Sequence, residues 1–245
     1  MNGLGMHGIR QVVAVELRLI VRDPMSAFFA LAFPALLLWV KMRTSDPLPD
    51  GLAVVDAMVP MLSTFVIGLA ALVVLPATLA QYRERRILKR LAATPAAPAM
   101  LLGAHWTAHM LLAAIGTALL VVLGSTAFGL QAPANGAEVL LAWLLGASSL
   151  GAIGLLLGAV VPTNRSATLI GLSLFFPMVF LSGVLIPRET MSDSMGEVGD
   201  LTPMAPVVET IRAAWSGQAL SATTLTAMAT ITLLAGFAAV KAFRP

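Results

Sequence analysis

The sequence predicts an all-α integral membrane protein with six spanning helices. Hydrophobic residues make up 58% of the 245 residues and charged residues only 11%, and the mean hydropathy is +0.91. In soluble domains roughly a quarter of the residues are charged. Long uncharged runs recur between short polar segments, and six spans of about 20 residues fill about half of the chain. We therefore expect residues 1–245 to form a single transmembrane domain without a sizeable soluble part.

Residues 9–22 are expected to form a helix that lies in the membrane interface. Arginines recur at helical spacing along one face, at Arg10, Arg18 and Arg22, while apolar residues populate the opposite face. Basic residues run through this segment instead of preceding an apolar block, so it does not fit a secretory signal peptide. Pro24 then ends the helix, because proline disfavours helical geometry in the residue before it.

The six spans are delimited by charges, prolines and glycines. They are expected at residues 25–42, 57–80, 101–129, 138–161, 166–186 and 220–240. Within the fourth span, Gly154 and Gly158 form a small-xxx-small step, which predicts close helix packing rather than a pore lining. In the long polar loop before the last span, residues 203–215 form either a short re-entrant helix or an ordinary solvent loop.

The distribution of basic residues predicts that both termini lie in the cytoplasm. With the N-terminus inside, only four of the 15 Lys and Arg residues lie outside, namely Lys41, Arg43, Arg188 and Arg212, and most of the 12 acids lie outside. Cytoplasmic loops of membrane proteins carry the excess of Lys and Arg, which selects this orientation. Residues 82–95, between the second and third spans, hold a third of all basic residues and are therefore expected in the cytoplasm.

Motifs for catalysis are absent from the sequence. It contains no Gly-Lys-Ser/Thr phosphate-binding sequence, no His-Glu-x-x-His and no Gly-x-Ser-x-Gly. We therefore expect no enzyme activity, no catalytic residues and no cofactor bound by this chain. The absence of charged residues deep inside the spans argues against a proton- or sodium-coupled carrier, because such residues are costly in hydrocarbon and are kept for ion relays.

One pair of side chains has the spacing of metal ligands. His105 and His109 lie at i and i+4, as two zinc ligands on a helix do, but no third ligand accompanies them. The alternative is two interfacial histidines near a helix end. We favour the alternative and expect no metal site. The chain has no cysteine, which excludes thiolate ligands.

Four short patterns occur in order along the chain and carry a family resemblance. They are Glu16-Leu17 with Arg22-Asp23-Pro24 and Phe33-Pro34; Glu84 with Leu88-Lys89-Arg90-Leu91 and Thr94-Pro95; Phe176-Pro177 with Leu181-Ser182-Gly183 and Pro187; and Leu201-Thr202-Pro203 with Glu209 and Arg212. Together, between six spans, they resemble the permease subunit of ATP-binding-cassette exporters of the second type, which include antibiotic, polysaccharide and sodium exporters. This chain has Arg86-Ile87 where the family commonly has Gly-Thr, and Thr202 where it commonly has Asn.

The resemblance implies a function and a set of partners. The chain would be the permease subunit of an ATP-driven exporter in the cytoplasmic (inner) membrane, most similar to drug and antibiotic exporters of the multidrug-efflux kind. It would work as a dimer with a second copy or a related chain, and would bind two copies of a cytoplasmic ATPase, which would hold the ATP and Mg²⁺. Membrane lipid is the remaining partner, and no nucleic acid is expected.

The resemblance also assigns roles to residues. The coupling helix that docks on the ATPase would lie in residues 82–95 and use Glu84, Arg85, Ile87, Leu88, Lys89, Leu91, Thr94 and Pro95. The connecting helix at the membrane surface would use Glu16, Arg18, Arg22 and Asp23. An outer gate or re-entrant segment would use Phe176, Pro177, Leu181, Ser182, Gly183, Pro203, Glu209 and Arg212.

Alternatives stay open for the basic stretch and for the whole chain. In a helix over residues 83–93, Ile87, Leu88 and Leu91 form an apolar ridge bordered by charge, which fits a protein groove. Five basic residues at about 1 kcal/mol each also suffice to hold this helix on anionic lipid. For the chain, the alternatives to an exporter permease are a gradient-driven carrier or channel and a membrane subunit that transports nothing.

Overall fold

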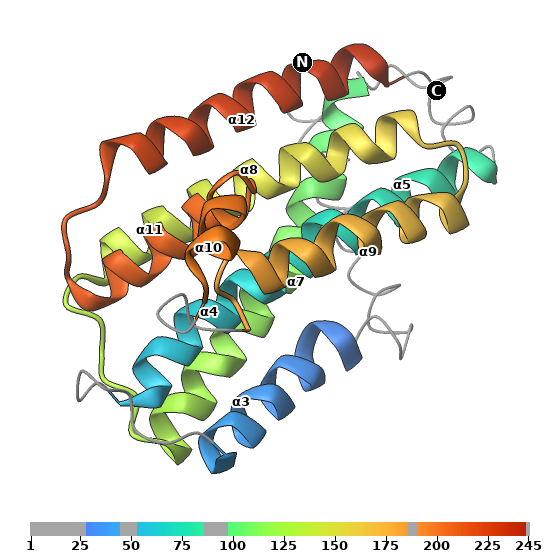
Figure 1. Cartoon of the computed structure of the whole chain (residues 1–245). Helices are drawn as coiled ribbons and strands as arrows, with labels where there is room; N and C mark the ends of the chain where they lie inside the picture. Colours follow the sequence, from blue (N-terminus) through green and yellow to red (C-terminus); the bar gives the residue numbers. More distant parts are fainter. Residues whose placement is uncertain (1–27, 45–52, 86–97, 186–190, 244–245) are drawn as a thin grey trace, which may run out of the picture.

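The computed structural model describes residues 28–44, 53–85, 98–185 and 191–243, and every regular element within these ranges is a helix. In chain order the elements are η1 (Phe28–Ala32), α3 (Phe33–Thr44), α4 (Val54–Leu69), η2 (Ala70–Val74), α5 (Leu75–Glu84), α7 (Pro98–Ala127), α8 (Gly136–Val160), α9 (Asn164–Leu181), α10 (Asp193–Asp200), α11 (Ala205–Ser216) and α12 (Ala222–Ala242). Figure 1 shows the long helices packed side by side in one bundle. The predicted all-α class is confirmed.

Five helices in the described ranges are long and apolar enough to cross a membrane. They are Val54–Glu84, Leu102–Ala127, Gly136–Val160, Asn164–Leu181 and Ala222–Ala242. Their order matches the second to sixth predicted spans. The first predicted span, 25–42, corresponds to η1 and α3, with its first residues outside the described ranges. A sixth span remains a prediction.

The second span is longer than predicted at both ends. It was expected at 57–80 and runs continuously from Val54 to Glu84 through α4, η2 and α5. The start of the basic stretch, 82–84, is therefore the last turn of a spanning helix and not part of a separate one. Local backbone hydrogen bonds continue through this turn, because Arg85 N–H still donates to the carbonyl of Gln81.

The other spans end near the predicted residues, with local causes for the differences. The fourth begins at Gly136 rather than 138, because the side chain of Asn135 accepts hydrogen bonds from the first amides of α8 and caps it. The fifth ends at Leu181 rather than 186, because Gly183 adopts a left-handed φ of 92° that stops the helix. The third and sixth are shifted by a few residues, to Pro98–Ala127 and Ala222–Ala242.

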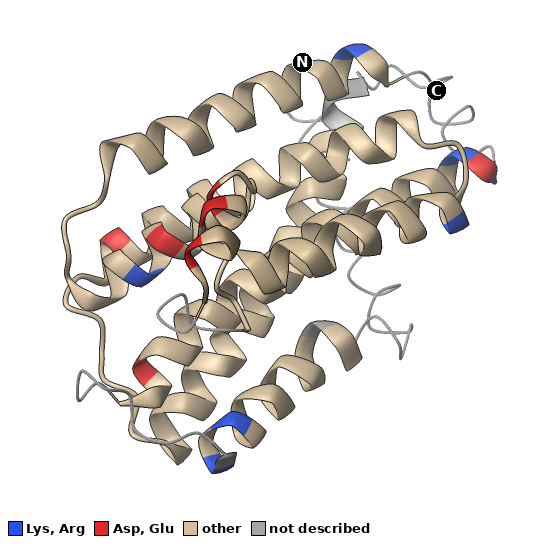
Figure 2. Cartoon of the chain, in the orientation of Figure 1, with Lys and Arg blue, Asp and Glu red and all other residues tan. Residues whose placement is uncertain are grey.

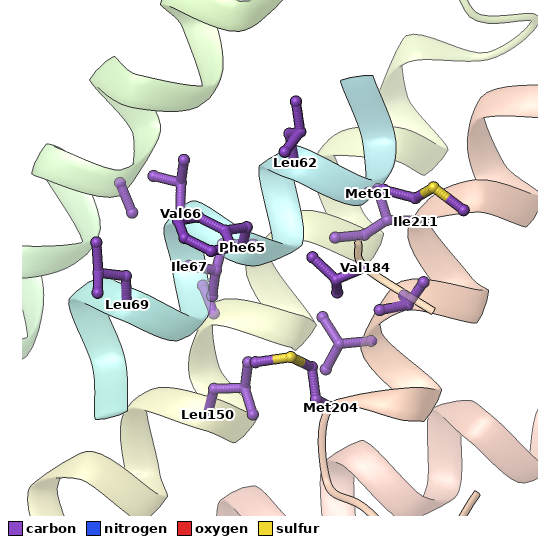
Figure 3. Close-up of a cluster of buried hydrophobic side chains, with 14 of the residues drawn as sticks. Met61, Leu62, Phe65, Val66, Ile67, Leu69, Leu150, Val184, Met204 and Ile211 are labelled. Atoms are coloured by element: carbon purple, nitrogen blue, oxygen red, sulfur yellow. The ribbon is translucent and has the colours of Figure 1, made fainter. Parts of the chain in front are cut away.

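The second span is the centre of the bundle. Its most apolar window is 94% buried, whereas the corresponding window of α12 is 11% buried. Figure 3 shows side chains of α4 pointing to several sides, with Leu150 of α8 and Met204 beside it. The ring of Phe65 on α4 packs edge-on against Phe175 of α9, with 5.1 Å between centroids. A displacement of this central helix would therefore change its packing against most of the other helices.

A π-helical segment, η2, interrupts this central helix. Pro76 has no N–H, so the carbonyl of Leu72 loses its usual α-helical partner, and Leu75 N–H donates five residues back, to Ala70. Glycines of two neighbouring spans pack directly on the loosened backbone: Gly154 of α8 on the Ala71 carbonyl and Gly171 of α9 on the Leu72 carbonyl. The predicted packing role of the Gly154–Gly158 step is thereby confirmed within one chain.

The loop between the fifth and sixth spans contains two helices, α10 and α11. The predicted helix at 203–215 is present as α11, and it is not an ordinary solvent loop. Its face with Val207, Val208 and Ile211 is buried against α4, α8 and α12. Gly146 of α8 gives space for Val207. In Figure 2 the charged residues that the structure describes gather toward opposite ends of the bundle.

Candidate functional site

The last turn of α5 leads into the basic stretch and lies beside the turn between α8 and α9 (Figure 1). Its three residues face different neighbours. The ring of Tyr82 packs against that of His105 on α7, with 5.0 Å between centroids. Arg83 and Glu84 contact the ends of α8 and α9, as described next. The C-terminal end of the second span thus touches three other spans.

Arg83 binds the C-terminal end of α8 through both terminal nitrogens of its guanidinium. Nη1 donates to the carbonyl oxygen of Val161 over 2.9 Å, and Nη2 donates to that of Ala159 over 2.6 Å. The last carbonyls of a helix have no partner in the helix backbone. The planar fork of an arginine is suited to bind two such oxygens at once. Arg83 therefore caps α8 from another span.

Glu84 binds the N-terminal end of α9. Its Oε1 accepts a hydrogen bond from the backbone N–H of Asn164 over 3.2 Å, and Asn164 is the first residue of α9. The first amides of a helix are likewise unsatisfied within the helix. The side chain of Asn164 returns a bond to α5, because its Nδ2 donates to the carbonyl of Ala77 over 3.0 Å. Four hydrogen bonds therefore join α5 to the α8–α9 turn.

These contacts match the electrostatics of both helix ends. A helix carries partial negative charge at its C-terminus and partial positive charge at its N-terminus. The cation of Arg83 lies at the C-terminus of α8, and the anion of Glu84 lies at the N-terminus of α9. We name this arrangement of Arg83, Glu84 and Asn164 the polar clamp.

The structure describes only part of the predicted ATPase-docking residues. Glu84 and Arg85 are described, and both are exposed. The remaining residues of that set lie outside the described ranges, as does the whole connecting-helix set: Ile87, Leu88, Lys89, Leu91, Thr94 and Pro95; Glu16, Arg18, Arg22 and Asp23. Docking of these residues on an ATPase stays a prediction. What the structure adds is that the carboxylate of Glu84 also has a partner inside the chain.

The two histidines on α7 are inside the helix packing and not at a surface. His105 is 1% exposed and His109 is 0% exposed. His109 contacts α5 through Nε2, 3.3 Å from the hydroxyl of Thr78, and its Nδ1 lies 2.8 Å from the carbonyl of His105. Among the described residues no group of three or more His, Cys, Asp or Glu is placed to hold a metal ion. The pair joins α7 to α5, and its predicted position at the membrane interface stays a prediction.

At the opposite end of the bundle, a cavity of about 540 Å³ lies between α11, α12 and the N-terminus of α4. Its lining includes Asp56, Ser182, Glu209, Arg212, Trp215 and Thr224. Three residues of the predicted outer set, Ser182, Glu209 and Arg212, therefore share one cavity. The predicted ion pair between Glu209 and Arg212 stays a prediction.

The remaining outer residues lie along the path from α9 to α11. Phe176 and Pro177 are inside α9, where the ring of Phe176 contacts that of Phe175. Leu181 ends α9, and its carbonyl is approached by Gly199 of α10. Gly183 and Pro203 lie in the turns that follow α9 and precede α11. These residues belong to α9 and to the connection from α9 to α11, and they are not among the residues that line the cavity.

Two features at the C-terminal end of α5 are not predicted by the sequence. Nothing in the sequence distinguishes Arg83 from the other four basic residues of residues 82–95, yet in the described part of the chain it reaches α8. Asn164 falls in the four-residue connection, 162–165, between the fourth and fifth predicted spans. The available signal is a pair of opposite charges just after one predicted span and this short connection between two later ones, but their contact depends on how the spans pack.

A family model described as ABC-2 type transporter matches residues 7–215. A search of curated proteins found no match. The matched range covers most of the 245 residues and includes the basic stretch, the polar clamp and all of α11 except its last residue. Together with the five apolar helices, this match shows that the chain is a multi-pass membrane protein of the ABC-2 type transporter family, a family of permease subunits.

Proposed function

We propose that this chain is the membrane subunit of an ATP-driven exporter and that residues 82–95 dock on a separate cytoplasmic ATPase. The observation that carries this proposal is the origin of the basic stretch. Its first residues, 82–84, are the last turn of α5, which ends the most deeply enclosed span. A protein that binds this stretch can therefore displace the helix at the centre of the bundle. Family membership supplies the expectation of an ATPase partner.

The topology in this proposal has six spans with both termini in the cytoplasm. The ends of α5 and α12 and the start of α9 carry basic residues: Arg83, Arg85, Lys241 and Arg165. The α10–α11 region carries most of the described acids: Asp193, Glu197, Asp200 and Glu209. Among the described residues, Glu84 is the one acid at the basic end, whereas Lys41, Arg43 and Arg212 lie toward the other end with the remaining acids. This bias of charge, which can be followed in Figure 2, supports a cytoplasmic position for the basic end.

The proposed assembly contains two permease chains, identical or related, and two ATPase subunits. ATP and Mg²⁺ bind to the ATPase, because this sequence has no phosphate-binding motif. The permease pair forms the path, and α11 with its cavity closes it on the outer side as a re-entrant helix. The one-sided burial of α11 supports this placement, since backbone at membrane depth must be enclosed by protein. Substrates of the drug and antibiotic kind follow from the resemblance.

The docking proposal is tested with Leu88→Arg, a substitution in the predicted apolar ridge. We expect loss of ATPase binding, because a charge placed in an apolar groove is desolvated without a partner, at a cost of several kcal/mol. The measurement is co-purification of a Walker-motif ATPase with the tagged chain, together with its rate of ATP hydrolysis.

Leu201→Arg is the matched control. It makes the same change at a residue that is 84% exposed, in the α10–α11 region at the other end of the bundle. We expect ATPase binding and hydrolysis to be unchanged in this variant. Equal co-purification with the unmutated, Leu88→Arg and Leu201→Arg chains would remove residues 82–95 from the docking surface.

A further inference from the structure

We propose that Arg83 and Glu84 are positioning residues that make the α8–α9 hairpin move together with the basic stretch. A displacement of residues 82–95 by the ATPase would then reach four spans: the two that the stretch joins in sequence and, through the polar clamp, α8 and α9. This inference rests on the proposed function and adds to it the route by which docking changes the bundle.

The order of charges in the polar clamp matches the directions of the two helices that it binds. Two consecutive residues with opposite charges meet two helix ends with opposite partial charges, and each bond has the favourable sign. Hydrogen bonds with an ionised partner are roughly twice as strong as neutral ones. Arg83 is only partly exposed, so water screens its bonds less than at an open surface.

Close packing of α5 against α8 accompanies the polar clamp. Gly158 of α8 lies directly on Leu79 of α5, and a larger residue there would collide with it. Leu75 and Leu79 form a buried apolar cluster with Ala159, the residue whose carbonyl Arg83 binds. On the α9 side, Asn164 contacts both Ala77 and Glu84. The inner ends of the three helices therefore have little freedom to slide past one another.

The polar clamp lies at the start of the basic stretch. Glu84 is the last residue of α5 and belongs to residues 82–95 of the sequence. A shift or rotation of the stretch acts first on this turn. While the clamp holds, the α8–α9 turn must follow. When it is released, the turn is connected to the stretch only through the apolar contacts further along α5.

The experiment measures how far the α8–α9 turn moves when the ATPase binds nucleotide. The chain contains no cysteine, so Leu36→Cys and Pro162→Cys introduce the only two thiols for nitroxide labels. Leu36 is 48% exposed on α3, which is not one of the four spans, and residue 162 in the α8–α9 turn is exposed. The distance between the labels is recorded by electron paramagnetic resonance for the complex with its ATPase, with ADP and with ATP plus vanadate.

Arg83→Gln is the test variant, since it removes the charge and the fork while keeping much of the side chain. Arg83 is not among the residues assigned to docking within residues 82–95, and its guanidinium contacts α8 instead. We therefore expect ATPase binding and ATP hydrolysis to stay within about twofold of the unmutated complex, whereas most of the nucleotide-dependent change in label distance is lost. Arg83→Lys keeps the charge but lacks the fork for two carbonyls, so we expect an intermediate change. If Arg83→Gln does not fold, Arg83→Lys carries the test.

Arg165→Gln is the matched control. It removes the same charge from an exposed residue in the first turn of α9, one position after Asn164, and we expect a full distance change. A full change in Arg83→Gln or in Arg83→Lys would overturn the inference while leaving the proposed function intact. Absence of ATPase binding to the unmutated chain would overturn the proposed function and this inference with it.

Discussion

At the scale of single residues, glycines and polar groups determine how closely the spans approach. Gly154 and Gly171 bring two helices onto the carbonyls of the π segment. Without a hydrophobic driving force between helices in lipid, such close packing and interhelical hydrogen bonds provide much of the association energy. The same reasoning applies to Trp143, whose indole N–H donates to the Thr117 hydroxyl across α7 and α8 over 3.1 Å.

Gly154→Ala tests the importance of this approach. A Cβ at position 154 would overlap the carbonyl oxygen of Ala71, so the spans must move apart, and we expect destabilisation by about 1–3 kcal/mol. Gly236→Ala on α12 is the control. A Cβ there meets nothing within 4 Å, and alanine favours a helix over glycine by up to about 1 kcal/mol. The midpoint of thermal unfolding in detergent should fall for Gly154→Ala and stay or rise for Gly236→Ala.

A lower midpoint for Gly236→Ala than for Gly154→Ala would contradict the role given to the glycine contacts. In that case the stability of the bundle would depend on the exposed face of α12, which is 11% buried in its most apolar window. Such a result would point to burial of that face in an assembly.

At the scale of elements, α11 shows most clearly what packing adds to sequence. The sequence of residues 203–215 is compatible with a re-entrant helix and equally with a solvent loop, because a short amphipathic segment between two spans can form either. The structure buries Val207 and Ile211 against three spans and leaves Glu209 exposed. Its end is set by Gly217, which adopts a left-handed φ of 71°.

Labelling of single cysteines tests this arrangement of α11. Residues two positions apart on a helix face nearly opposite sides, so we expect Glu209→Cys to react with a maleimide in mild detergent at least about tenfold faster than Ile211→Cys, whose thiol is reached only through local opening. In denaturing detergent both should react alike, which controls for the reagent. Equal rates in mild detergent would show that α11 is detached from the bundle.

At the scale of the whole molecule, the sequence predicts where the spanning helices lie along the chain, but it does not predict which residues of different helices touch. Hydropathy and charge placed five of the spans to within a few residues, since length and apolarity are imposed by the bilayer. The π segment η2 and the polar clamp depend on which carbonyls other spans approach, and no local pattern contains that information. Glu84 and Asn164 are 80 residues apart in sequence and meet only in the folded bundle.

The sidedness of the bundle is the last prediction, and the proposed function depends on it. Gln218, in the turn between α11 and α12, and Pro162, in the turn between α8 and α9, are both exposed, and the proposed topology puts them on opposite sides of the membrane. With a membrane-impermeant maleimide on intact cells, we expect Gln218→Cys to be labelled, and Pro162→Cys to be labelled only after permeabilisation. The unmutated chain, which has no cysteine, measures the background. The reverse pattern would place the basic stretch outside, where it meets no ATP-hydrolysing partner, and the docking proposal and the role of the polar clamp would both fall.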